Sequence, residues 1–298
     1  MRFTHTRKKS RQCLQNRKVM ANDILNMKRF GKYLASDLRA CVSNFAITFA
    51  VAAAAPVALY FFYGIFHLII TGFWGGIPLV ARVPLFGLIL ILFLIALPVS
   101  CYGRLTDKRA GSQFLLLPVS SFEKTVSMIL ICCIIAPALF IACYGLLDAL
   151  ICLCDSSCGA ALLSFSYIKD VSGLITAEAD IPAEYLDSFL AVANPAQYID
   201  DFISIGLIFL LGALCFKKGK VAKTMLALVL ISIVVSMAFS PLTISFANRI
   251  ANADDPRIIF EKFGGVLRNL ALVDTISDTV VNLLLSALIF VRVRTLKH

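Results

Sequence analysis

Three aspartates are placed where a carboxylate could bind a molecule at the edge of a membrane. Asp148 follows a long apolar run, and Asp274 and Asp278 precede another, four residues apart on one face of a helix. Acidic side chains close to hydrocarbon usually face a cavity or the bundle interior. The sequence therefore suggests an outer vestibule formed by these three acids. The alternative is that they are interfacial acids with no special role.

Metal and thiol chemistry have little support from residue spacing. His67 stands alone in an apolar run, so we expect a satisfied or interfacial histidine rather than a metal ligand. Cys152, Cys154 and Cys158 are close in sequence; either Cys154 and Cys158 form a disulfide or all three are unpaired thiols, which we favour. The remaining cysteines within or beside apolar runs are expected to behave as small hydrophobic residues: Cys41, Cys101, Cys132, Cys133, Cys143 and Cys215.

Motifs for enzymatic chemistry are absent from the sequence. There is no phosphate-binding G-x-x-x-x-G-K-[ST], no G-x-S-x-G and no H-E-x-x-H. The apolar runs also offer few polar groups that could pair inside a membrane. We therefore predict no catalytic residue, no metal site, no cofactor and no enzymatic activity.

A polar, proline-broken turn at 104–124 stands directly before a long apolar run. Pro118 interrupts the chain, Ser120 or Ser121 can cap the following helix, and Glu123 complements the positive end of its dipole. Such a segment predicts a rigid knob that is continuous with a membrane helix.

Composition identifies the elements that must position these residues. Of the 298 residues 59% are hydrophobic and 15% charged, and the mean hydropathy is +0.87. Soluble domains carry about 25% charged residues. The sequence predicts an all-α, polytopic membrane bundle of six transmembrane helices in the lipid bilayer, at about 44–70, 84–103, 125–147, 202–216, 224–246 and 272–291. Pro56, Pro98, Pro137 and Pro241 invite kinks in four of them.

The distribution of charge predicts the orientation. With six spans, the N-terminus, the 104–124 and 217–223 loops and the C-terminus share one side, which carries 22 Lys and Arg against four acids. The other side carries six basic residues and fourteen acids. Because basic loops stay in the cytoplasm, both termini are expected there. The excess of positive charge is thus a topology signal, and we expect no nucleic-acid binding.

The predicted domain organisation follows these spans. Residues 1–20 are expected to be a disordered basic N-terminus, with Met20 or Met27 as alternative starts, and 21–43 an amphipathic helix in the membrane interface; a plain tail is the alternative. Residues 44–298 form the membrane domain, with a cytoplasmic segment 104–124 and extracytoplasmic loops 148–201 and 247–271. Around Gly264–Gly265 we expect two half-helices, which either re-enter the outer leaflet or lie flat on it.

Two segments resemble a known family. "LLLPVSSFEKTVSMIL" resembles the segment between the second and third spans of type-two ABC transporter permeases, and more closely a group of bacterial permease-like membrane proteins with "LLLPAS..EKF.S". "MKRFGKYLASDLRA" resembles the interfacial N-terminal helix of that group. The chain differs from many type-two permeases in having Ser121–Phe122 where they have a basic residue, and its acidic 155–200 loop is long for the plainest exporters.

The resemblance implies a function. In the family, six-helix subunits pair as dimers, the segment between spans two and three receives the stroke of a separate ATPase subunit, and short re-entrant helices lie between spans five and six. It implies an export permease, a homodimer in the bacterial cytoplasmic (inner) membrane, and a coupling segment made of Leu115, Leu116, Leu117, Pro118, Val119, Ser120, Ser121, Glu123 and Lys124. The alternative is a non-transporting membrane scaffold or sensor with acidic extracytoplasmic loops.

Overall fold

The computed structural model describes residues 26–106, 119–159, 161–162, 195–251 and 256–295. Within these ranges the side chains of residues 80, 195–198, 239, 242–251 and 256–275 are not described. The described chain is helical and contains no strand. The predictions for residues 1–20, for Leu115–Pro118 and for most of the 148–201 loop therefore lie outside the described residues.

Five segments of the described chain are long and apolar enough to cross a membrane, which makes this a multi-pass helical protein. They contain or overlap five of the six predicted spans. The sixth, predicted at 202–216, lies in helix α10, which is not among the five. The five segments are Met27–Thr71, Ala81–Thr106, Ser121–Cys154, Lys220–Ala238 and Ile276–Thr295.

The first segment consists of two helices, α2 (Met27–Ala53) and α3 (Ala55–Thr71), which meet at Ala54. The break falls where Pro56 occupies the first turn of α3, a position at which proline's missing N–H costs nothing. The boundary predicted near residue 43, between an interfacial helix and a span, is not marked by a break, because α2 continues through that position. Its apolar face is buried through Tyr33, Cys41 and Phe45.

The second segment is α4 (Leu79–Tyr102), which is followed by a short 3-10 turn, η1 (Gly103–Thr106). The third is α6 (Ser121–Ile129), a π-helical turn η2 (Leu130–Ile135) and α7 (Ala136–Cys154), which leads to the 3-10 turn η3 (Ser156–Cys158). The π-helical turn stands immediately before Pro137 in α7. Proline's ring clashes with the carbonyl four residues earlier, here that of Cys133, and a wider turn at this point relieves the clash.

Helix α10 (Pro195–Cys215) occupies the middle of the bundle between α4 and α12. Leu207, Leu210 and Leu214 are completely or almost completely buried. The predicted span at this position is short for a membrane crossing. Because α10 is surrounded by other helices, its length does not have to match the lipid on its own.

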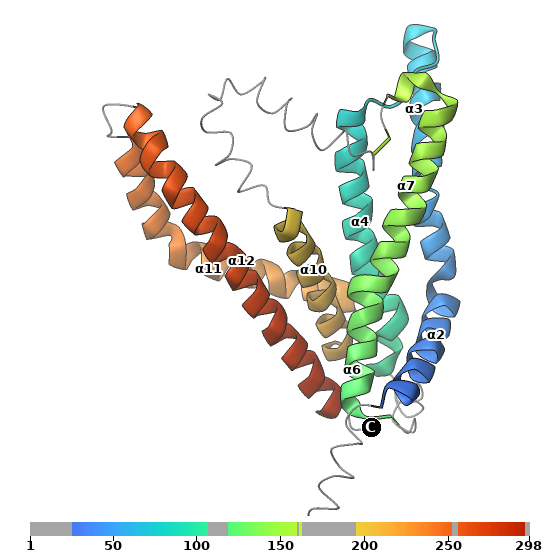
Figure 1. Ribbon diagram of the computed structural model, residues 1–298, viewed down its shortest axis with the longest axis vertical. Helices are drawn as coiled ribbons and strands as arrows, with labels where there is room; N and C mark the ends of the chain where they lie inside the picture. The colour runs from blue at the N-terminus through green and yellow to red at the C-terminus, as the bar shows by residue number, and fades with distance from the viewer. Residues whose placement is uncertain (1–25, 107–118, 160, 163–194, 252–255, 296–298) are drawn as a thin grey trace, which may run out of the picture.

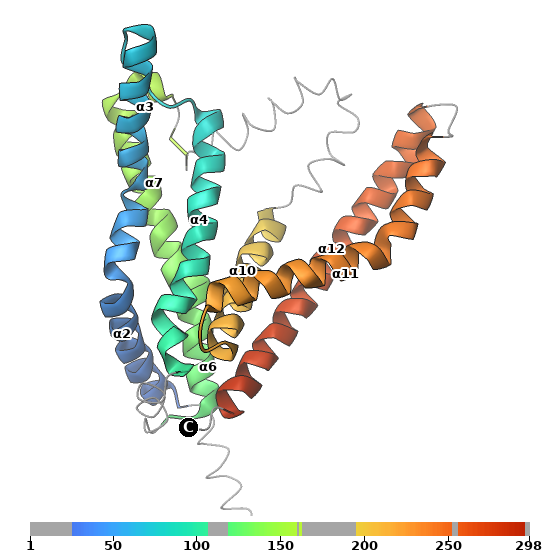
Figure 2. The ribbon, with the colours of Figure 1, turned by 180° about the vertical axis from the view of Figure 1, so that it is seen from behind.

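The last two helices are α11 (Lys220–Ala251) and α12 (Pro256–Thr295). Helix α11 starts beside α10 and α4 and crosses α12 in the view of Figure 2, which also shows a bend within α11, the helix that contains Pro241. Beyond this bend α11 and the first part of α12 point away from α4 and α7. The predicted loop 247–271 with two half-helices is corrected here, since α12 passes through Gly264–Gly265 without a break. A helical glycine costs about 1 kcal/mol relative to alanine, which is too little to interrupt a helix of this length.

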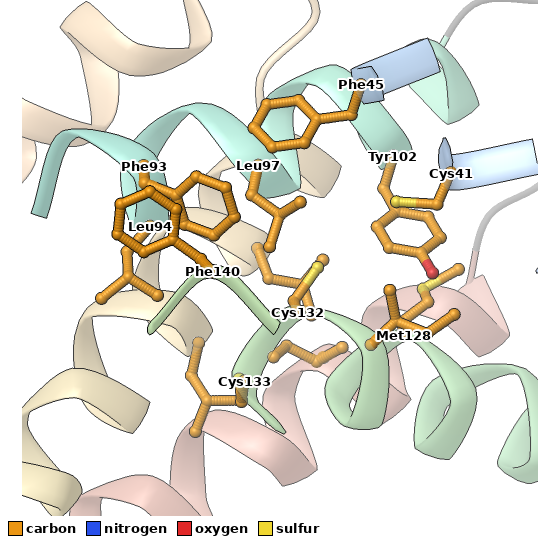
Figure 3. Close-up of a cluster of buried hydrophobic side chains, with 14 of the residues drawn as sticks. Cys41, Phe45, Phe93, Leu94, Leu97, Tyr102, Met128, Cys132, Cys133 and Phe140 are labelled. Atoms are coloured by element: carbon orange, nitrogen blue, oxygen red, sulfur yellow. The ribbon is translucent and has the colours of Figure 1, made fainter. Parts of the chain in front are cut away.

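The core lies where α2, α4, α7 and α10 meet. Phe93 and Phe140 stack with their ring centroids 4.5 Å apart, and Phe45 approaches Phe93 edge-on at 5.3 Å. Figure 3 shows this cluster, with Phe93, Leu94 and Leu97 of α4 beside Phe140 of α7. These apolar contacts hold the N-terminal half together as one packed body.

Candidate functional site

The start of α6 has the cap that the sequence predicts. The Ser120 hydroxyl accepts the N–H of Glu123 at 3.2 Å, and the Glu123 carboxylate accepts the N–H of Ser120 at 3.2 Å. This reciprocal pair is a capping box, which satisfies two donors that a helix start otherwise leaves without partners. Ser121, the other predicted cap, is the first residue of the helix. The segment 119–124 is thereby fixed to α6.

Glu123 also joins α6 to the start of α2. Its fully buried carboxylate accepts hydrogen bonds from Arg29 Nε and Nη2, each at 3.0 Å, and from the backbone N–H of Asn26 at 2.9 Å. An arginine that binds a carboxylate through two nitrogens fixes both distance and angle. Arg29 lies 94 residues from Glu123, so the sequence did not reveal this pair.

A second polar contact lies two turns further along α2. The carboxylate of Asp37 accepts the hydroxyl of Ser127 from α6 at 2.7 Å and that of Tyr102 from α4 at 3.0 Å. Ser127 and Tyr102 are buried. Three helices are thus tied by one carboxylate, which sequence inspection missed because none of its partners is near it in the chain.

The other residues of the predicted coupling segment join the same end of the bundle. Val119 packs on the hydrophobic core and Lys124 is 5% exposed. Phe122 contacts Phe290 of α12 edge-on, at 6.3 Å between ring centroids. We use the name inner hub for the residues that form the contacts described so far at this end of the bundle. They are Asn26, Arg29, Asp37, Tyr102, Ser120, Phe122, Glu123, Ser127 and Phe290. The inner hub connects α2, α4, α6 and α12, and Figure 1 shows the starts of α2 and α6 and the end of α12 together.

A buried ion pair stabilises the opposite end. Arg82 Nη1 lies 2.9 Å from Asp148 Oδ1 and 2.9 Å from Cys152 Sγ, and Nη2 donates to the carbonyl of Cys158. The second oxygen of Asp148 accepts the N–H of Leu162 at 2.8 Å. Arg82 and Asp148 are 7% and 2% exposed, so this charge pair is part of the protein interior. A pocket beside it is also lined by Tyr60 and Tyr144.

The three vestibule aspartates do not share these surroundings. Asp148 belongs to α7 and pairs with Arg82, whereas Asp278 is half-buried on α12. The side chain of Asp274 is outside the described residues. Near Asp278, α12 is bound to α10 through Asn282, which accepts the Ser204 hydroxyl at 2.7 Å. Because α12 diverges from α7 in this direction, the described residues do not place Asp148 and Asp278 around one cavity.

A hydrogen-bonded corner joins α3 to the turn that follows α7. Asp155 accepts the hydroxyl of Tyr60 at 2.7 Å and both the hydroxyl and the N–H of Ser157, at 2.6 and 2.9 Å. Trp74 Nε1 donates to the Tyr60 oxygen at 2.9 Å. The hydrogen bonds from Ser157 and Tyr60 lower the pKa of Asp155. Gly72 ends α3 in a left-handed conformation, with φ at 77°, which returns the chain towards this corner.

The cysteines differ in part from expectation. Cys41 of α2 and Cys101 of α4 form a disulfide, so the prediction that both are simple hydrophobic residues was wrong. The pairing needed the packing of two helices and had no local signal. Cys152, Cys154 and Cys158 form no disulfide among the described residues, as favoured, and burial raises the pKa of Cys158. His67 bonds to Thr71 and the Phe73 carbonyl, and no metal-binding group of His, Cys, Asp or Glu occurs among the described residues.

A signal for the ion pair between Arg82 and Asp148 was present in the sequence. Arg82 and Asp148 each stand at the edge of an apolar run, and both edges were assigned to the same side of the membrane. Opposite charges at matching depth tend to pair, because an isolated charge near hydrocarbon is costly. Comparison with protein-family models, with curated proteins and with solved structures finds no match for this chain.

Proposed function

We propose that this chain is the membrane-spanning permease subunit of an export system and works with a separate ATPase subunit as a homodimer. In this proposal it crosses the bacterial cytoplasmic membrane six times, and both termini lie in the cytoplasm. Helix α10 is the fourth crossing in chain order and adds to the five segments that are long and apolar enough on their own. The basis is the resemblance of residues 115–124 to the coupling segment of type-two ABC transporter permeases, together with the excess of Lys and Arg at the same end of the chain's predicted topology.

The observation that supports this proposal most directly is the bond between Glu123 and Arg29. A force applied to the segment before α6 reaches α6 through the capping box and α2 through this ion pair. The inner hub also contacts α12 through Phe122 and Phe290, so the same force reaches the diverging arm made of α11 and α12. A push at the joined end of two arms changes the angle between them, which is a hinge movement of the kind that opens and closes a binding site.

The experiment is co-purification of the full chain with the ATPase subunits of its host membrane. Glu123→Gln and Arg29→Gln are compared with Lys28→Gln, an exposed neighbour outside the inner hub. We expect an ATPase to be recovered with the wild type, and ATP-dependent export to fall at least tenfold in the two hub variants while Lys28→Gln stays unaffected. Recovery of no ATPase with the wild type contradicts the proposal.

The alternative is a non-transporting scaffold or sensor. Its support comes from the links that hold the helices in place: the Cys41–Cys101 disulfide between α2 and α4, and the buried Arg82–Asp148 pair between α4 and α7. These bonds resist relative movement of three helices. A membrane protein that transports nothing, and that binds a partner through residues exposed outside the membrane, fits such a rigid half. Normal function of the Glu123→Gln variant favours this alternative.

A further inference from the structure

A pocket lined by basic residues lies between α2, the end of α4 and the start of α11, and it shares no residue with the inner hub. It is lined by Asn44 of α2, by Val99, Ser100, Gly103 and Arg104 at the end of α4, and by Lys217 and Lys220 at the start of α11. Its volume is about 360 Å³. Three cations therefore come from two parts of the chain that are more than a hundred residues apart, and no carboxylate is among the described lining residues.

Two of the cations are held in place by neighbouring groups. Lys220 Nζ donates to the carbonyl of Gly103 and to the hydroxyl of Thr106, the latter at 2.6 Å. Arg104 Nη1 donates to the side-chain oxygen of Asn44 at 3.2 Å. A guanidinium carries five N–H donors, so one bond to Asn44 leaves donors for a ligand. An ordered cation binds an anion with less loss of side-chain entropy than a mobile one.

The backbone reinforces this charge. Helix α11 begins at Lys220, so the positive end of its dipole lies at the pocket. Gly219 has φ at 61°, a left-handed conformation that favours glycine and turns the chain into α11. Gly103 is in turn placed close to Lys220, where a Cβ would lie 3.3 Å from Nζ. Small residues thus let the basic side chains gather.

The depth of the pocket identifies the kind of anion. The segment Ala81–Thr106 ends at this pocket and the segment Lys220–Ala238 begins at it. The ends of membrane helices lie at the level of the lipid headgroups, and basic pockets between such helices attract anionic lipids. Val99 also lines the pocket beside the cations, which suits a ligand that is charged at one end only.

We infer that Arg104, Lys217 and Lys220 bind the phosphate of an anionic phospholipid headgroup in this pocket. The assignment is independent of the proposed transport function and of which leaflet the pocket faces. Bidentate contact from Arg104 is the geometry that arginine forms with phosphate, while the lysines act as point charges.

The test uses the full chain in detergent, with bound lipid measured by native mass spectrometry. Phosphatidylglycerol is the anionic probe, phosphatidylcholine the zwitterionic one and inorganic phosphate the soluble one. We compare the double variant Arg104→Gln/Lys217→Gln with Lys218→Gln/Lys223→Gln. The control loses the same charge from exposed residues that do not line the pocket.

We expect the wild type to retain phosphatidylglycerol in preference to phosphatidylcholine. Each basic residue contributes about fivefold to the affinity for an anionic lipid, so the loss of two should reduce this preference about 25-fold. The control should lose less than about twofold. The single variant Arg104→Lys, in which Lys217 is unchanged, should keep part of the preference. Thermal unfolding of each variant separates lost binding from lost folding. Equal losses in both double variants, or no lipid preference in the wild type, contradict the inference, and displacement of the lipid by an equal concentration of inorganic phosphate overturns the lipid assignment.

Discussion

At the residue scale, the described protein depends on a few charged side chains that are enclosed and fully bonded. Glu123 and Asp148 are each buried carboxylates with an arginine partner and additional N–H donors. Charges removed from water need such partners, because an isolated one loses several kcal/mol of hydration. The sequence predicted a functional position for both residues but predicted neither partner.

The Arg82–Asp148 pair makes a prediction about stability. Asp148→Asn leaves the Arg82 charge buried without its counter-ion, so we expect a loss of about 3–5 kcal/mol in the free energy of unfolding. Arg82→Met/Asp148→Leu removes both charges and should recover much of that loss. Thermal unfolding in detergent measures both, with Asp201→Asn, an exposed acid of α10, as the control. A double variant less stable than Asp148→Asn would contradict the interpretation of the pair.

Asp155 makes a prediction about pH. Its pKa is lowered in the folded protein by hydrogen bonds from Ser157 and Tyr60, so folding favours the ionised form. The stabilisation is present above the unfolded pKa, about 3.9, and is lost as pH falls through the lower folded value. The melting temperature of the wild type should therefore fall more between pH 5 and pH 3 than that of Asp155→Asn (pH values chosen to bracket about 3.9). Parallel melting curves for the two proteins would show that these hydrogen bonds do not stabilise the fold.

At the element scale, small residues decide how closely helices approach. Gly212 of α10 faces Thr224 of α11, and a Cβ at Gly212 would lie 2.0 Å from the Thr224 hydroxyl oxygen. Both residues are buried. Close contacts at glycine are a common means of joining membrane helices, which lack a strong hydrophobic drive to associate. The start of α11, and with it Lys220, is therefore held against the bundle by this contact.

Gly212→Ala tests that contact. The new methyl group forces α10 and α11 apart or displaces Thr224, and we expect a loss of about 1–3 kcal/mol. Gly87→Ala is the matched control, since a Cβ at Gly87 of α4 has nothing within 4 Å and should be neutral or stabilising. Thermal unfolding in detergent distinguishes the two. Equal stability of both variants would mean that α10 and α11 are not packed at Gly212.

Helix boundaries follow local chemistry where it is strong and tertiary packing where it is weak. The sequence predicted Ser120 or Ser121 as the cap and Glu123 in the first turn, and the structure confirms Ser120 as the cap, to which Glu123 adds the reciprocal bond of a capping box. The glycine pair at 264–265 was wrongly predicted to break a helix, since two glycines cost less than a 40-residue helix gains. The boundary predicted near position 43, between an interfacial helix and the first span, coincides with no break in α2 and stays a prediction.

At the scale of the whole molecule, hydrogen bonds near both ends of the described chain tie those ends to the middle of the chain. Asn26 contacts Glu123 at the start of α6, and Arg292 near the end of α12 donates to the carbonyl of Leu214 at 3.2 Å. Lys220 at the start of α11 contacts the end of α4. The start of α2, the start of α6 and the end of α12 therefore lie at the same end of the described helices (Figure 1).

The orientation proposed from charge makes a prediction of its own. In a cysteine-free background, single cysteines at Ser112 (Ser112→Cys), Cys154 and Cys215 report on the two sides; Cys154 and Cys215 are exposed thiols of the native chain. An impermeant thiol reagent should label Cys154 on intact cells, and position 112 and Cys215 only after permeabilisation. Labelling of position 112 on intact cells would reverse the orientation and remove the basis for coupling to a cytoplasmic ATPase.

The sequence by itself determined the class of protein, the approximate positions of the apolar helices and the cap of α6. These features depend on composition and on residues close in the chain, for which a period or a spacing is sufficient. Only the tertiary structure decided the partners of Glu123, Asp148 and Cys41, which lie 94, 66 and 60 residues away. It also decided that α10 lies in the middle of the bundle and that α11 and α12 lead away from α4 and α7. The physical reason is that lipid and protein interior are equally apolar, so a hydrophobic helix face does not indicate which of the two it will contact.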